Sequence, residues 1–125
     1  NEYKEERFIP VAYDVNKIKW NDHNLIIDTY TNKHDAGTWT QSPIDEKINM
    51  VVNTSCEHMN NTWYENLPEG TFVVLHTNNY FENEQHSNCC KDMNEVKSKY
   101  PMQSIMYEGE LDTNLYNRFM LIGVK

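Results

Sequence analysis

The apolar residues of this chain are concentrated in four short runs, and each run ends at a polar residue. The runs cover residues 8–13, 25–27, 48–52 and 71–75. Continuous apolarity over so few residues is typical of strands that are buried on both faces of a parallel sheet. No run approaches the ~20 residues that a membrane-spanning helix needs, so the sequence predicts no such helix.

Two helices are predicted around the fourth run. Residues 54–67 begin with the capping-box pair Thr54 and Glu57, continue with apolar residues at helical spacing, and meet Pro68. A second helix is predicted near 91–100, where apolar residues again fall on one helical face.

The carboxyl-terminal part has a different pattern. Residues 104–110 and 117–124 are β-prone and predict an antiparallel terminal pair, whereas the polar stretch 29–47 predicts mostly loop. The order of these elements indicates an α/β fold with a mainly parallel, Rossmann-like sheet. Because no repeat or linker interrupts the chain, we predict a single domain over 1–125.

The charge of the chain excludes one class of partner. Lys and Arg number 11 against 19 Asp and Glu, a formal net charge of −8, and residues 48–90 contain no Lys or Arg. A protein that neutralises phosphate backbones needs the opposite sign, so double-stranded nucleic acid is not an expected partner. The three cysteines make no disulfide framework, and we predict reduced thiols and a cytoplasmic location.

Chemically capable side chains cluster where the third run ends. An amide, a carboxylate and an imidazole follow within six positions, and the predicted catalytic residues are Asn53, Glu57 and His58. The start of a helix there would present free backbone N–H groups to a ligand. Structural roles as helix caps and core residues are the alternative.

Polar and aromatic side chains also follow the fourth run. His76, Asn78 and Tyr80 are predicted to line a substrate cleft, because neighbouring parallel strands end at the same sheet edge. His76 is expected to share this cleft with Asn53 and Glu57. Asp14 and Asp28 end the first two runs, and from that edge they could reach the ribose hydroxyls or an amino group of a cofactor. The alternative is that these residues only form turns and stop strands.

The histidines and cysteines could form a metal site or have structural roles. The possible ligands are Cys56, His58, His76, His86, Cys89 and Cys90. No Cys-x-x-Cys or His-x-x-x-His pair is present, so the spacing favours structural roles and predicts no metal site.

Residues 48–59, read as an apolar strand followed by Asn-Thr-Ser-Cys-Glu-His-Met, resemble small Rossmann-like methyltransferase-type proteins of phages and marine microbes. The resemblance continues through Leu-His-Thr-Asn-Asn-Tyr-Phe, Glu-x-His-x-Asn-Cys, Gly-Glu-Leu and Tyr-x-Arg-Phe-Met-Leu-Ile-Gly, and it covers roughly residues 48–125. It implies a class I methyltransferase that uses S-adenosylmethionine, with a sheet ending in an antiparallel strand pair.

The resemblance also assigns roles to particular residues. It implies that Asp14 contacts the cofactor ribose and that Asn53 faces a small-molecule or nucleotide-like substrate. Only 13 residues precede Asp14, and no Gly-rich cofactor loop is present. The chain is therefore expected to be the carboxyl-terminal part of such a fold, lacking the first strand-loop-helix unit, with an unknown methyl acceptor and weak cofactor binding.

Three functions follow as hypotheses. The first is a methyltransferase that positions S-adenosylmethionine and its acceptor for an in-line displacement. The second is a non-catalytic acidic binding protein of phage origin that uses its negative charge to occupy a basic partner. The third is a small metal-binding protein.

Overall fold

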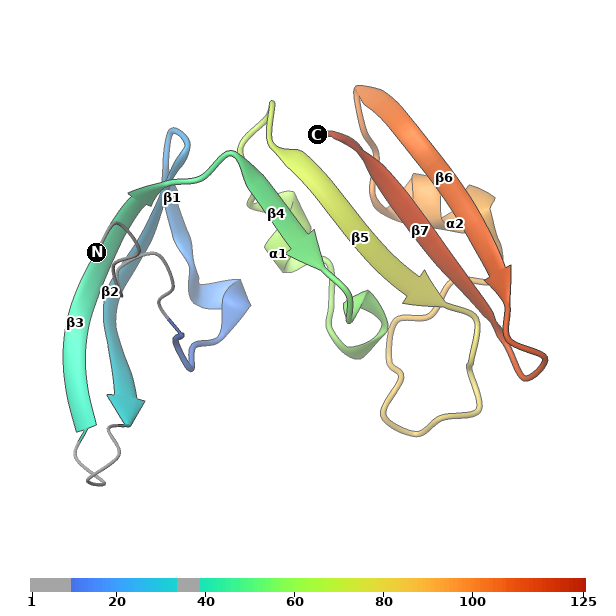
Figure 1. Cartoon of the computed structure of the whole chain (residues 1–125), viewed down its shortest axis with the longest axis horizontal. Helices are drawn as coiled ribbons and strands as arrows, with labels where there is room; N and C mark the ends of the chain where they lie inside the picture. Colours follow the sequence, from blue (N-terminus) through green and yellow to red (C-terminus); the bar gives the residue numbers. More distant parts are fainter. Residues whose placement is uncertain (1–9, 34–38) are drawn as a thin grey trace, which may run out of the picture. The chain divides into compact units, whose positions relative to one another are not determined.

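The computed structural model describes residues 10–33 and 39–125 and divides the chain into two compact units, residues 1–47 and 48–125 (Figure 1). Each unit is described by itself below. That the whole chain forms one domain stays a prediction.

The first unit contains a three-stranded antiparallel sheet. A short 3-10 helix, η2 (Val15–Lys17), precedes β1 (Lys19–Asn21), β2 (Asn24–Lys33) and β3 (Trp39–Lys47), which pair in that order. The β1–β2 turn is tight, and Asp22 adopts a positive φ of 54° there.

This unit corrects two predictions. Most of residues 29–47 are strand rather than loop, apart from 34–38, which lie outside the described residues. The run 25–27 lies in β2, between two antiparallel neighbours, and is not a strand of a parallel sheet. Most of the run 8–13 lies outside the described residues.

The second unit is built on a four-stranded sheet in the order β4-β5-β7-β6 (Figure 1). The strands are β4 (Met50–Asn53), β5 (Phe72–Asn78), β6 (Ser104–Asp112) and β7 (Asn117–Val124). Only β4 and β5 run parallel, while β7 pairs antiparallel with both of its neighbours. The predicted terminal antiparallel pair is present, but the prediction of a mainly parallel Rossmann-like sheet is wrong.

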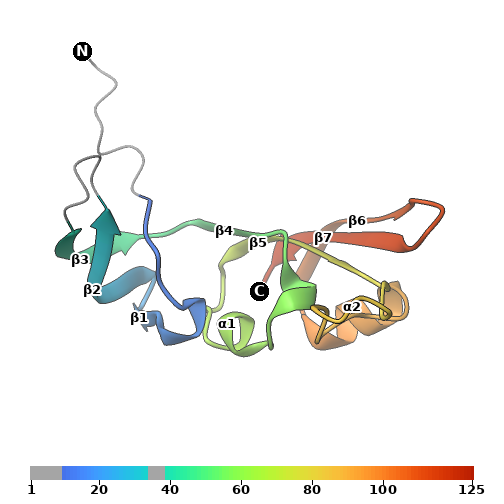
Figure 2. The same ribbon diagram turned by 90° about the horizontal axis from the view of Figure 1, so that it is seen from below.

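The helical segments of this unit lie on one face of the sheet, as Figure 2 shows. They are the 3-10 helix η3 (Cys56–His58), the single-turn α1 (Thr62–Glu65) and α2 (Met93–Lys99). The helix predicted near 91–100 is therefore confirmed. The one predicted over 54–67 is instead two short pieces, because Met59 between them has extended backbone (φ −142°, ψ 158°).

The core of the second unit lies between the sheet and these helical segments. Alternate residues of the two central strands point into it, and Val73, Leu75, Phe119 and Leu121 are at most 1% exposed. Aromatic rings of the helical layer meet them from the other side. The Lys125 ammonium closes one end of the core by donating to three carbonyl oxygens, those of Tyr64, Glu65 and Leu67.

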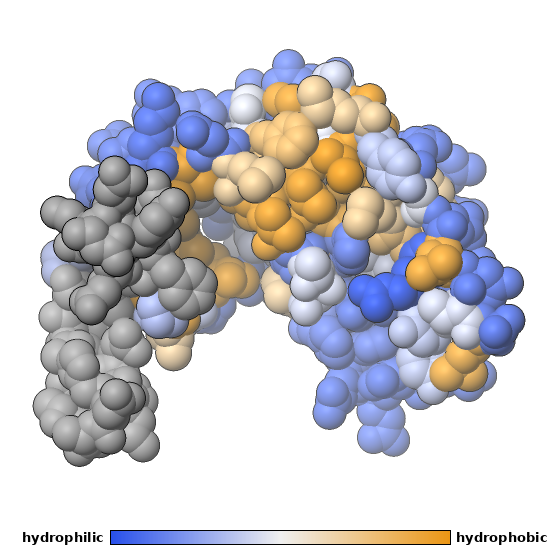
Figure 3. All heavy atoms as spheres, in the orientation of Figure 1, coloured by the Kyte–Doolittle hydropathy of each residue, from blue (hydrophilic) through white to orange (hydrophobic). Residues whose placement is uncertain are grey.

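The opposite face of the sheet is apolar but is not covered by helices of this unit. Figure 3 shows apolar side chains gathered over β4 and β5 on the side turned away from the helices. Met50 and Val52 are 53% and 55% exposed, and Phe72, Val74 and Ile122 are partly exposed. A doubly wound fold would bury this face under a second layer of helices, so this observation also contradicts the predicted fold class.

Among the residues that the structure describes, no helix combines the length and apolarity needed to cross a membrane.

Candidate functional site

The candidate site forms where a long loop folds back onto η3. The loop, residues 79–92, connects β5 to α2. Its Ser87 and Asn88 backbone N–H groups both donate to the Glu57 carbonyl oxygen, at 2.9 and 3.0 Å. The Asn88 side chain adds a bond to the Met59 carbonyl oxygen at 2.8 Å. These bonds fix the loop against η3 and bring its side chains next to Glu57.

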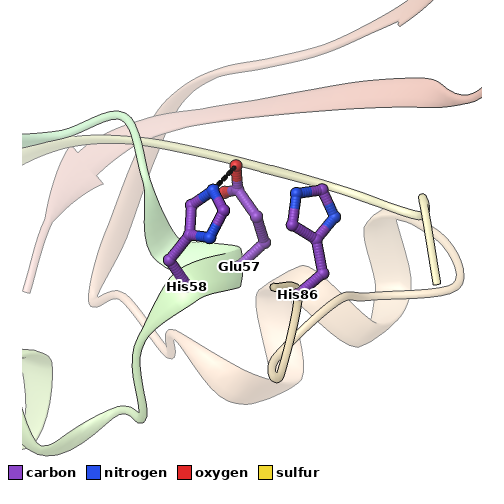
Figure 4. A group of neighbouring side chains, drawn as sticks. All are labelled: Glu57, His58 and His86. Atoms are coloured by element: carbon purple, nitrogen blue, oxygen red, sulfur yellow. Dashed lines mark ion pairs between the residues drawn. The ribbon is translucent and has the colours of Figure 1, made fainter. Parts of the chain in front are cut away.

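Three potential metal ligands meet at this junction. Glu57 and His58 come from η3 and His86 comes from the 79–92 loop, and one ligand atom of each lies within 4.8 Å of the others. In Figure 4 the two imidazoles stand on either side of the Glu57 carboxylate. The imidazoles meet edge to face with ring centroids 4.7 Å apart.

Both imidazoles are oriented by the backbone of the loop. His58 Nδ1 lies 3.0 Å from the Gln85 carbonyl oxygen, and His86 Nδ1 lies 2.9 Å from the Tyr80 carbonyl oxygen. A carbonyl oxygen can only accept, so each Nδ1 carries the hydrogen. In the neutral ring the Nε2 lone pair is then free to bind a metal, which is how proteins commonly fix metal-ligating histidines.

The Glu57 carboxylate is buried without enough partners. The residue is 8% exposed, and its Oε2 atom has no hydrogen-bond partner among the described residues. Its Oε1 atom lies 3.6 Å from His58 Nε2. A buried carboxylate costs several kcal/mol unless a cation or donor compensates it. The two oriented imidazoles supply no such donor when both are neutral.

Aromatic side chains line the loop side of the site. Tyr80 stacks on Tyr116 with ring centroids 5.0 Å apart and meets His86 edge to face at 5.8 Å. The Tyr80 ring thus packs against the same imidazole that bonds to the Tyr80 carbonyl oxygen. The position of His86 is therefore set by packing as well as by the backbone.

The predicted catalytic and cleft residues are only partly brought together. Asn53 ends β4 and lies near η3, where its Oδ1 accepts from Ser55 N at 2.9 Å and its Nδ2 donates to Met59 Sδ at 3.2 Å. Asn78 ends β5 and is buried, and its Oδ1 accepts from Tyr80 N at 3.1 Å. Both amides thus make structural hydrogen bonds beside the site.

His76 does not join this group. It pairs with Met120 in the sheet and lines a hollow on the face that lacks helices, whereas its neighbours Leu75 and Thr77 point into the core. The expectation that His76, Asn53 and Glu57 share one cleft is therefore wrong. Adjacent residues of a strand point to opposite faces of the sheet, so the His76 side chain points away from the face on which Leu75 and Thr77 are buried.

The two predicted cofactor-binding residues lie in the first unit. Asp14 caps η2 by accepting from Asn16 N at 2.9 Å, and Asp28 forms an exposed ion pair with Lys19 at 3.0 Å. These are the strand-stopping and capping roles that the sequence offered as the alternative. Nothing in these contacts favours a cofactor.

The three cysteines are buried free thiols and contribute no ligand to the cluster. Burial raises the pKa of the Cys56 thiol to about 12 and that of Cys90 to about 11. A nucleophilic or metal-binding cysteine needs a low pKa and access. The observed surroundings favour structural roles.

Alkylation of Cys56 by iodoacetamide at about pH 8 should therefore be much slower in the folded chain than in the chain unfolded by urea. A pKa of about 12 leaves roughly a thousandth of the thiolate that an ordinary cysteine has at the same pH. Mass spectrometry of the alkylated peptide, with and without urea, measures the difference. Equal rates in both conditions would show that Cys56 is accessible and reactive.

Comparison of the chain with protein-family models, with curated proteins and with solved structures found no match. The geometry of the site is therefore the basis for a functional proposal.

His86 is the residue of this cluster that the sequence does not assign to the catalytic group. Its sequence context places it only among the possible ligands with the other histidines and the cysteines, a set that does not contain Glu57. The two ligands next to each other in the sequence, Glu57 and His58, are joined by His86 from a distant loop. Backbone hydrogen bonds hold that loop next to η3. Such bonds cannot be predicted from the spacing of side chains in the sequence.

Proposed function

We propose that this protein binds a divalent transition-metal ion, with Zn²⁺ as the first candidate, through Glu57, His58 and His86. The observation that carries the proposal is the buried Glu57 carboxylate, which faces two imidazoles whose Nδ1 atoms are already engaged by carbonyl oxygens. A cation between these groups would compensate the carboxylate and use both Nε2 lone pairs.

The donor set suits such an ion. Zn²⁺ accepts imidazole nitrogen and carboxylate oxygen, and two histidines with one glutamate are a known Zn²⁺ combination. Ligand atoms at ~2.0–2.1 Å from a tetrahedral ion lie about 3.4 Å apart. The Glu57–His58 separation of 3.6 Å is close to this value, and His86 would move inward to complete the set.

Three protein ligands would leave one tetrahedral position for water or another ligand. The His58 side chain is 39% exposed, so solvent has access to this side of the site. Sites with three protein ligands and an open position are those in which Zn²⁺ activates water or polarises a carbonyl. The ion would also tie the 79–92 loop to η3.

A titration of the metal-stripped protein with Zn²⁺ tests the proposal. Calorimetry should show one ion bound per chain, with a rise in melting temperature that depends on Zn²⁺ concentration. His86→Ala should weaken binding by more than the 10–100-fold that is typical of outer-shell changes. His76→Ala is the matched control, because His76 lies outside the cluster, and it should leave the affinity unchanged.

Unchanged binding in His86→Ala would contradict the proposed site. Absence of binding in the unmodified chain would contradict the proposed function as well.

Methyltransferase activity stays a prediction without support from the fold on which it rested. A cytoplasmic location also stays a proposal, and the three free thiols support it because reducing compartments keep cysteines unpaired.

A further inference from the structure

The outer edge of β6 is available for pairing. β6 is the last strand in the sheet order, and within the described part of the chain only β7 pairs with it. Alternate N–H and C=O groups of an edge strand point away from the sheet and can pair with another extended chain. The register of β6 shifts between Ile105 and Tyr107, so the regular template is the six residues 107–112, which is long enough to pair with an added strand.

The two faces of β6 have different chemistry. Residues directly opposite each other in β6 and β7 lie on the same face of the sheet. Leu121 and Phe119 of β7 are buried on the helix side, so their partners in β6 lie on that side too. The helix-side residues of β6 are Glu108, Glu110 and Asp112, and the residues on the other face are Tyr107, Gly109 and Leu111. Acidic side chains therefore alternate with an apolar face.

A hollow lies on the apolar face beside this edge. Its volume is about 260 Å³, and it is lined by residues of β5, β6 and β7 that include His76, Tyr107, Leu111, Arg118 and Met120. Gly109 also lines it, and the Tyr107 ring packs over this glycine, 2.8 Å from where a Cβ would stand. Such a hollow has room for an aliphatic side chain of an added strand.

The acidic face is only partly neutralised. Glu108 pairs with Lys97 at 3.1 Å, whereas no ion pair with a described residue compensates Glu110 or Asp112. The chain as a whole carries a net charge of −8. This field favours basic partners and disfavours a second copy, whose β6 would bring another acidic row to the same face.

We propose that the outer edge of β6 binds an extended peptide segment in which basic and apolar side chains alternate. The segment pairs its backbone with β6, places its basic side chains beside Glu110 and Asp112, and places an apolar side chain in the hollow near Gly109. This mode is strand addition, in which main-chain bonds supply affinity and alternate side chains supply specificity. It does not depend on the metal site.

Synthetic peptides test this proposal directly on the full chain. The probe is acetyl-Lys-Val-Lys-Leu-Lys-Val-Lys-amide, and the controls are the same residues in the order Lys-Lys-Lys-Lys-Val-Leu-Val and the alternating peptide with Glu in place of Lys. Fluorescence anisotropy should show the alternating basic peptide binding at least about tenfold more tightly than either control. NMR amide shifts should map to β6.

Two further measurements separate strand addition from simple charge attraction. A probe N-methylated at the residues that face β6 should lose binding, because it lacks the donors for pairing. Glu110→Lys should weaken binding about tenfold. Glu46→Lys, which makes the same charge change in the first unit, should have little effect.

Equal binding of the scrambled peptide, retained binding of the N-methylated probe, or shifts confined to other elements would overturn the proposal. Sedimentation of the chain alone should show no association through β6. A dimer of the chain that the alternating basic peptide dissociates would instead identify a second copy as the occupant of this edge and would also overturn it.

Discussion

Glu57→Gln should remove most of the zinc-dependent stabilisation while making the metal-free protein more stable. At about pH 8, where an imidazole is ordinarily neutral, the carboxylate is buried beside the His58 lone pair, and no residue that the structure describes bonds to its Oε2 atom. A glutamine amide removes the buried charge and can donate to that lone pair. We expect the free energy of unfolding without metal to rise by about 1 kcal/mol.

The stabilisation that Zn²⁺ adds should be smaller in Glu57→Gln than in the unmodified chain. At a Zn²⁺ concentration 100 times the dissociation constant, binding stabilises the unmodified chain by about 2.7 kcal/mol. A variant that binds about 100-fold more weakly gains about 0.4 kcal/mol at that concentration. Urea unfolding of both proteins, with and without Zn²⁺, measures all four values. A metal-free variant that is less stable than the unmodified chain would show that Glu57 is compensated by the protein alone.

Leu75→Ala should cost about 3 kcal/mol of unfolding free energy, with a range of ~2–5. Leu75 is fully buried in β5 and pairs with Leu121 of β7, which is also fully buried. Truncation leaves a cavity in a layer held by two strands and the helical segments, so the surroundings can collapse only partly. Chemical unfolding with tryptophan fluorescence is the measurement.

Leu111→Ala is the matched control for this change. Leu111 belongs to the same sheet but is 62% exposed, on the face without helices. Its truncation should change stability by no more than about 0.5 kcal/mol. Similar losses for the two leucines would show that the second face of the sheet is buried in solution.

The apolar runs predicted where strands of the second unit lie, but not how the strands are arranged. Continuous apolarity was interpreted as burial between two helical layers. In β5, Val73 and Leu75 point into the core, while Phe72 and Val74 belong to the partly exposed face. An apolar open face and a second buried face produce the same residue pattern, so the sequence alone could not distinguish them.

The strands of the first unit carry a weaker signal. Residues 29–47 are polar, but they contain Thr-Tyr-Thr and Thr-Trp-Thr, residue types that favour strands without forming an apolar run. The lack of an apolar run indicates a loop, whereas the β-propensity of these residues agrees with the strands β2 and β3 that form there.

The sequence predicts two residues of the candidate site, Glu57 and His58, but not the third, His86. Glu57 and His58 follow a strand end, where polar side chains commonly serve a ligand, and both belong to the cluster. His86 enters through the 79–92 loop, whose path is fixed by hydrogen bonds to the Glu57 carbonyl oxygen. Main-chain bonds of this kind depend on the folded path and leave no mark in residue spacing.

The position of β7 has a consequence for how the second unit is made during protein synthesis. β7 lies between β5 and β6, yet it is the last of the three to leave the ribosome. Until then β5 can pair only with β4 and β6 has no neighbour, so one edge of Phe72–Asn78 and both edges of Ser104–Asp112 are unpaired. Completion of this sheet therefore waits for residues 117–124, and the nascent chain exposes these unpaired strand edges for as long as those residues are missing.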